Sequence, residues 1–177
     1  MAEIVLGVTG SIAAYKACEL TRLFVKAGHG VHVVMTKAGT EFVTPLTFKT
    51  LSRNTVATGL FDNPEVWTPG HISLAVLADV VVIAPCTANV IAKLANGIAD
   101  DMLTSTCLAT SAPLMVAPAM NTGMWENEAT QANVAILRER GVRFVESGVC
   151  DLACGTEGKG RMAEPLEIFD AVETLLA

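Results

Sequence analysis

The sequence has few aromatic residues and no long apolar segment. Aromatic side chains make up 5% of its 177 residues. No apolar run reaches the roughly 18 to 20 residues that a membrane-spanning helix requires. The longest runs, 78–85 and 112–120, have the length of strands, and the opening MAEIVLGVTG lacks the basic start and unbroken apolar core of a signal peptide. We therefore expect a cytoplasmic globular protein that does not enter the membrane.

Positive charge is also in deficit, and the cysteines form no recognisable framework. The net charge of −6 disfavours nonspecific binding to nucleic acid. Cys18 and Cys107 are most simply interpreted as small buried apolar residues. The one close pair, Cys150 and Cys154, has no second pair or nearby histidine, so we expect no metal site. The five cysteines are odd in number and scattered, which indicates a reducing compartment rather than disulfides: Cys18, Cys86, Cys107, Cys150 and Cys154.

Short apolar segments that alternate with helical patterns are abundant. We expect strands at 3–9, 31–36, 78–85, 112–120 and 142–147 and helices within 10–28, 87–97, 125–141 and 165–177. The strands are continuously apolar, which is typical of a parallel sheet covered on both faces. The sequence thus predicts a doubly wound α/β fold in a single domain. The high mean hydropathy of +0.47 further predicts apolar subunit interfaces.

Unusual residues follow these strands at the positions where such sheets bind ligands. Gly10 and Ser11 lie between the first strand and its helix, where free backbone N–H groups suit a phosphate. The stretch matches neither a dinucleotide fingerprint nor a Walker loop, which leaves the phosphate of a mononucleotide or simply a capped tight turn. Asn121 follows the fourth strand and is a candidate ligand-binding residue. The alternative is that it only caps the next helix.

Four motifs and a cysteine-bearing segment occur together in one order along the chain. They are TGSIAAYK at 9–16, GHISLA at 70–75, PCTAN at 85–89, PAMNTGMW at 118–125 and ACGTEGKGRM at 153–162. In this set and order the chain resembles the flavin-containing cysteine decarboxylases, and among them those that act on phosphopantothenoylcysteine in coenzyme A biosynthesis. The resemblance extends over 1–177, which would form one FMN-binding domain of Rossmann-like, flavodoxin-like fold, with a substrate flap at about 148–162.

The resemblance implies a noncovalently bound FMN and a homo-oligomer. The FMN phosphate would lie near Gly10, Ser11, Ile12 and Thr36. The residues expected to hold the ring are Thr87, Ala88, Asn89, Val90 and Ala119. A trimer with flavin at the subunit interface, often assembled further into a dodecamer, would account for the apolar surplus.

The same resemblance gives three residues roles in the reaction. An oxidised flavin removes a hydride from the carbon bearing sulfur, and the resulting thioaldehyde makes loss of CO2 easy. His71 would serve as the base or acid in the oxidation step, and Asn121 would hold the substrate carboxylate. Cys154 would supply the proton when the ene-thiol is reduced to 4′-phosphopantetheine.

Other functions are compatible with these motifs, and the chain departs from the family pattern at Cys86 and Thr87. A peptidyl-cysteine decarboxylase that releases an ene-thiol, or a non-catalytic flavin-binding regulator, would share most of these motifs. A flavin prenyltransferase is disfavoured by PAMNTGMW. Cys86 and Thr87 replace the Ala-Ser of the family motif, which places a thiol close to the expected flavin. Many bacterial relatives continue into a ligase domain, and the sequence leaves open whether one follows here.

Overall fold

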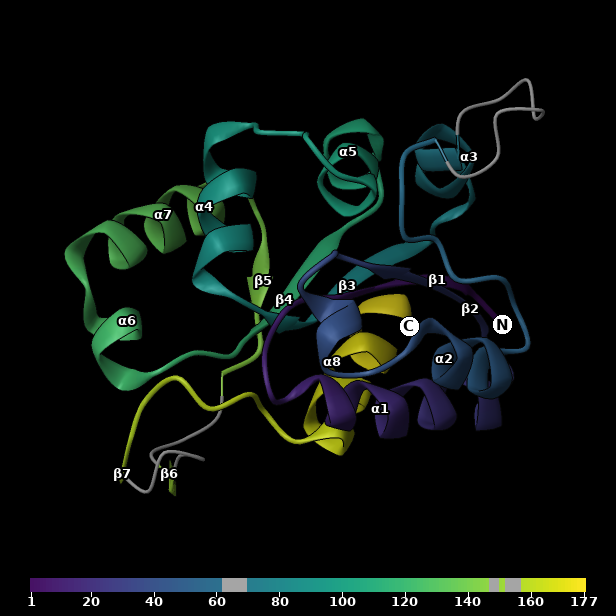
Figure 1. The fold of residues 1–177 in the computed structure, drawn as a ribbon, viewed down its shortest axis with the longest axis horizontal. Coiled ribbons are helices and arrows are strands. Elements are labelled where there is room, and N and C mark those ends of the chain that lie inside the picture. The colour runs from purple at the N-terminus through teal and green to yellow at the C-terminus, as the bar shows by residue number, and fades with distance from the viewer. Residues whose placement is uncertain (62–69, 147–149, 152–156) are drawn as a thin grey trace.

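A five-stranded parallel sheet forms the centre of the molecule (Figure 1). The computed structural model describes residues 1–61, 70–146, 150–151 and 157–177. The strand order is β2-β1-β3-β4-β5, which is the flavodoxin-like order and confirms the predicted fold class. The strands are β1 (Glu3–Val8), β2 (Gly30–Met35), β3 (Val80–Cys86), β4 (Leu114–Pro118) and β5 (Arg143–Phe144).

The middle of this sheet is buried on both faces, which explains the continuously apolar strand sequences. All seven residues of β3 are buried, and β1 has a single partly exposed residue, Glu3. Side chains that alternate along β1 enter different cores: Ile4 and Leu6 belong to one cluster, and Val5 belongs to the other. Burial on both faces requires helices on both sides of the sheet.

One face is covered by α1 (Ala14–Lys26), α2 (Pro45–Ser52) and α8 (Pro165–Leu176), which lie together in Figure 1. Their buried side chains, among them Phe24, Phe48 and Ile168, pack on the sheet. Gly28 has a φ of +90° just after α1, so this helix ends where the sequence predicted.

The other face is covered by α4 (Ala88–Asn96), α5 (Met102–Ala109) and α7 (Glu128–Glu139), and α3 (Gly70–Leu77) packs against α5. The single helix expected within 125–141 is instead divided into α6 (Thr122–Glu126) and α7. Asn127 causes this division, because its extended backbone interrupts the helix and its side chain accepts a hydrogen bond from Ala129 N–H.

The short elements complete the chain. The 3-10 turn η1 (Gly39–Glu41) follows β2, and β6 (Cys150–Asp151) pairs with β7 (Glu157–Gly158) in a separate antiparallel ribbon. Within the described residues, none of the helices has the length and apolar character needed to cross a membrane. Because all five strands of the sheet are parallel, the segments after β1, β2, β3 and β4 meet at one edge.

Candidate functional site

A cavity of about 470 Å³ opens at this edge, between the ends of β1, β2 and β3. Its volume lies in the range of small-molecule sites, about 300 to 1,000 Å³. It includes the switch point between β1 and β3, where ligands of doubly wound folds bind. The lining residues are Gly10, Thr36, Lys37, Ala38, Glu41, Thr87, Asn89, Val90, Lys93 and Asp101. Five residues predicted to bind the cofactor are in this set: Gly10, Thr36, Thr87, Asn89 and Val90.

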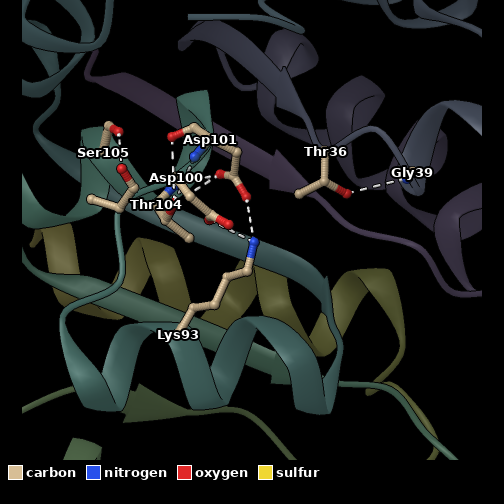
Figure 2. A network of polar contacts seen from close by, with 8 residues as sticks. Thr36, Gly39, Lys93, Asp100, Asp101, Thr104 and Ser105 are labelled. Atoms are coloured by element: carbon tan, nitrogen blue, oxygen red, sulfur yellow. Dashed lines mark hydrogen bonds and ion pairs between the residues drawn. The ribbon is translucent and has the colours of Figure 1, made fainter.

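Two tight turns form one wall of the cavity. A Cβ on Gly10 would lie 2.5 Å from Ala38 Cβ, so the glycine allows the turn after β1 to pack on the turn after β2. Thr36 is 9% exposed, and its hydroxyl oxygen accepts a hydrogen bond from Gly39 N–H at 3.1 Å (Figure 2). Position 10 therefore requires glycine because the two turns pack closely there.

Ser11 and Ile12 lie in the turn that precedes α1. Ser11 Oγ accepts a hydrogen bond from Ala13 N–H at 3.3 Å, and Ile12 is 59% exposed. Neither lines the cavity, although both follow Gly10 directly. Both residues come before the first residue of α1, Ala14, and belong to the turn that contains the lining residue Gly10.

Thr9 connects this turn to the end of β3, and no sequence pattern predicted this role. Its buried hydroxyl donates to the carbonyl of Pro85 at 2.7 Å and accepts from Thr87 N–H at 3.1 Å. The Ala84–Pro85 peptide is cis. Thr9 thereby holds the ends of β1 and β3 together beside the lining residues Gly10 and Thr87.

The start of α4 and the end of β4 lie next to each other. Thr87 precedes the first residue of α4, Ala88, and its side chain makes no capping hydrogen bond. Ala119 is 4% exposed, and its N–H donates to the carbonyl of Cys86 at 2.9 Å. Ala88 and Ala119 are therefore adjacent to the cavity without lining it.

A polar network lies on the far wall of the cavity (Figure 2). Lys93 Nζ is 2.7 Å from Asp100 Oδ1 and 3.1 Å from Asp101 Oδ2. Asp101 also caps α5, since its side chain accepts from Thr104 N–H at 2.8 Å. The hydrogen bond to Asp100 raises the pKa of Lys93, so the side chain stays a cation at neutral pH.

Sequence reasoning found neither Lys93 nor Asp101, although a signal for each existed. Lys93 lies one helical turn after Asn89, which places both on one face of α4. Asp101 stands three residues before Thr104 in a capping box. Lys37 and Ala38 follow the predicted residue Thr36 in the turn after β2.

Asn121 lies at the start of α6, where its Oδ1 accepts a hydrogen bond from Gly123 N–H at 2.8 Å. The capping alternative for this residue is therefore confirmed. Capping uses the acceptor of the amide, whereas a substrate carboxylate would bind its donor, Nδ2. The two roles are chemically compatible.

His71 lies in the first turn of α3, and its buried Nδ1 has no hydrogen-bond partner within the described part of the chain. Buried polar atoms of this kind are rare and need an explanation. Figure 1 shows α3 and α6 at opposite ends of the longer axis. One chain therefore does not bring His71 and Asn121 side by side.

Cys18, Cys86 and Cys107 all lie in or against the apolar cores. Cys86 is fully buried at the end of β3, and burial raises the pKa of its thiol well above the usual value. Burial also raises the pKa of Cys107 to about 12, and Cys18 is half-buried against the core. All three thiols are protonated at neutral pH, as expected for apolar packing residues. Cys154 lies outside the described residues.

The lining chemistry fits a phosphorylated ligand such as FMN. Thr36, Thr87 and Asn89 offer hydroxyl and amide donors, and Lys37 and Lys93 balance the charges of the two carboxylates in the cavity. No group of three or more histidine, cysteine or acidic residues in the described segments is arranged to hold a metal ion.

Comparison with known proteins agrees with this geometry. The coenzyme A biosynthesis bifunctional protein CoaBC of Bacillus subtilis (strain 168) is 49% identical over 171 residues, which are 97% of this chain and 42% of CoaBC. The chain thus spans less than half the length of the curated relatives it matches.

Two solved structures superpose over almost the whole chain. A Cys-to-Ser mutant of PPC decarboxylase complexed with pantothenoylaminoethenethiol has a TM-score of 0.88 and 34% identity, covering 99% of this chain and 98% of that one. The FMN binding protein AtHal3 has a TM-score of 0.85 and 35% identity, covering 98% and 96%. The Flavoprotein family model matches residues 1–177. The chain therefore belongs to the Flavoprotein family.

Proposed function

We propose that this chain is an FMN-dependent decarboxylase that converts 4′-phosphopantothenoylcysteine to 4′-phosphopantetheine in coenzyme A biosynthesis. The observation that carries the proposal is the end-to-end similarity to PPC decarboxylase, at a TM-score of 0.88 with 99% of this chain covered. The ligand of that relative is an ene-thiol, which is the product expected before the final reduction. The cavity at the β1/β3 switch point supplies a site for the cofactor.

The cofactor site of the proposal combines the cavity with the turns beside it. The phosphate binds near Gly10, Ser11, Ile12 and Thr36. Thr87, Ala88, Asn89, Val90 and Ala119 hold the ring. When bound, FMN supplies a two-electron acceptor for the hydride on the carbon next to sulfur, and it can return that hydride later.

The chain's own side chains bind the substrate and move its protons. His71 accepts or donates a proton at an imidazole nitrogen, and its buried Nδ1 lacks a partner among the described residues. Asn121 orients the carboxylate through Nδ2. A neutral amide suits this position, because a cation would stabilise the ground-state carboxylate whose charge must disappear. Cys154 donates the proton for the last step, and its retention favours the reduced product over a released ene-thiol.

The proposal includes a cytoplasmic homo-oligomer, trimeric or dodecameric, in which the site forms between subunits. His71 lies on α3 and Asn121 directly precedes α6, and these two helices lie on opposite sides of the molecule in Figure 1. The helix that carries His71 also exposes apolar side chains: Ile72 is 37%, Val76 83% and Leu77 41% exposed. In the proposed oligomer this face packs against a second copy, and His71 of one subunit lies beside Asn121 of another.

The test compares substrates with the purified, FMN-reconstituted protein. Phosphopantothenoylcysteine is expected to lose CO2 and yield 4′-phosphopantetheine, identified by mass spectrometry. A peptide ending in cysteine is the comparison substrate. Turnover of the peptide alone would favour the peptidyl-cysteine decarboxylase, and a protein that cannot bind FMN would contradict the proposal altogether.

A further inference from the structure

Gly160 contacts the loop that carries Asn121. Gly160 precedes α8 by a short segment, whereas Met120 and Asn121 follow β4. The N–H of Met120 donates a hydrogen bond to the carbonyl of Gly160 at 2.8 Å. Met120 lies between buried Ala119 and exposed Asn121, so this bond fixes the backbone at the point where the loop leaves the sheet.

The contact leaves no room for a side chain at position 160. A Cβ on Gly160 would lie 2.6 Å from Met120 O and 3.4 Å from Trp125 Cβ. Real Cβ atoms do not approach backbone oxygens to 2.6 Å, so one of the two segments would have to shift. Gly160 also has a φ of +109°, a conformation that residues other than glycine rarely adopt.

The segment around Gly160 is anchored on its other side. Glu146 and Met162 form an antiparallel bridge, and Met162 is 1% exposed in the core. Lys16 Nζ on α1 lies 2.8 Å from Glu164 Oε1, which also accepts from the Arg161 guanidinium. A side chain at position 160 would therefore displace the Met120–Asn121 loop more readily than its own segment.

We propose that Gly160 is a positioning residue for Asn121. Its carbonyl holds the Met120 N–H, and its bare Cα allows the Met120 carbonyl to approach. Together these contacts set the direction in which the Asn121 amide faces the substrate carboxylate. The inference rests on the proposed function, because it assigns Asn121 to that carboxylate.

The test replaces Gly160 by alanine and uses Gly28→Ala as the matched control. Gly28 has a φ of +90° and no atom within 4 Å of a built Cβ, so the control carries backbone strain without the steric contact. In the FMN-loaded protein, Gly160→Ala is expected to raise KM for phosphopantothenoylcysteine about tenfold, the effect of one lost polar contact. FMN affinity is expected to match the wild type in both variants, and KM is expected to stay unchanged in Gly28→Ala.

Amide hydrogen exchange at Met120 tests the same contact without turnover. The wild-type Met120 amide is expected to exchange slowly, and Gly160→Ala is expected to accelerate it while Gly28→Ala does not. A fast Met120 amide in the wild type, or equal KM values in both variants and the wild type, would overturn the inference. Failure of the wild type to turn over phosphopantothenoylcysteine would instead contradict the proposed function.

Discussion

Lys93 introduces a positive charge into a cavity that also contains carboxylates. Its side chain is 19% exposed and pairs with Asp100 and Asp101, which are 59% and 26% exposed. Without Lys93, the Asp101 carboxylate in the cavity wall would lose this ion-pair partner. Because like charges repel more strongly where water is partly excluded, the ion pair is expected to matter more for binding a phosphate than for folding.

Lys93→Met is expected to weaken FMN binding about tenfold, or about 1.4 kcal/mol, through repulsion between Asp101 and the phosphate. Riboflavin, which has no phosphate, is the control ligand and is expected to lose little affinity. The double variant Lys93→Met/Asp101→Asn is expected to recover FMN binding, since asparagine preserves the helix cap. Fluorescence titration measures each affinity, and equal losses for both ligands would contradict this account.

Sequence patterns predicted single site residues only where neighbouring positions in the chain explain the residue. Gly10 was found because it stands between a strand and a helix, and the structure adds that Ala38 fills the space beside it. Thr9 was missed because its partners, Pro85 and Thr87, are more than 70 positions away. Hydrogen bonds of that range leave no periodic trace in one sequence.

At the scale of elements, a partly buried ion pair joins α1 to the residue that precedes α8. Lys16 is 10% exposed and donates to Glu164, which precedes α8 and closes a capping box with Glu167. The hydrogen bond from Lys16 lowers the pKa of Glu164 below its usual value of 4.5. The ion pair thus links the helix after the proposed phosphate turn to the segment that contains Gly160.

This junction is expected to make stability fall in acid. Because the native pKa of Glu164 is lowered, its carboxylate stabilises the fold above pH 4.5, and this stabilisation is lost as pH falls through the native pKa. Glu164→Gln is expected to cost about 1 kcal/mol or less near neutrality and to flatten the decline of Tm below pH 4.5. Glu139→Gln, at an exposed site on α7, is the control. A wild-type slope in Glu164→Gln would refute the assignment.

The sequence predicted the long elements and missed the short ones. Strands 3–9 and 78–85 and the helix from Pro165 were predicted to within about two residues, because apolar runs and caps mark them. The helices at 45–52, 70–77 and 102–109 were not anticipated. Their apolar residues face partners on other elements or remain exposed, so helical periodicity is weak within them.

At the scale of the whole molecule, the strand order determines where the proposed cofactor site lies. Within a single chain, the proposed catalytic residue His71 and the proposed substrate-binding residue Asn121 are far apart. The cavity forms wherever β1 and β3 diverge, which the order β2-β1-β3-β4-β5 dictates. His71 on α3 and Asn121 at the start of α6 belong to elements that lie on opposite sides of the molecule in Figure 1. No sequence pattern reveals this separation, because it depends on how the helices are distributed over the sheet.

Mixing two inactive variants tests a site shared between subunits. His71→Asn and Asn121→Asp are each expected to abolish turnover. In a cyclic oligomer each interface joins two different patches, one with His71 and one with Asn121. Each patch is native in half of the subunits of a random mixture, so about a quarter of the interfaces contain both native residues. Decarboxylation is therefore expected to reappear in co-assembled samples and not in samples mixed without subunit exchange. Co-assembled oligomers that show no decarboxylation would contradict a site shared between subunits.

The most direct measurement is a single turnover of the FMN-loaded protein with phosphopantothenoylcysteine in the absence of oxygen. Flavin absorbance and product mass are followed together. The account predicts that the oxidised flavin absorbance falls and then returns as CO2 is released and 4′-phosphopantetheine forms. Release of CO2 with no change in flavin absorbance, or FMN-loaded protein that leaves the substrate intact, would contradict it.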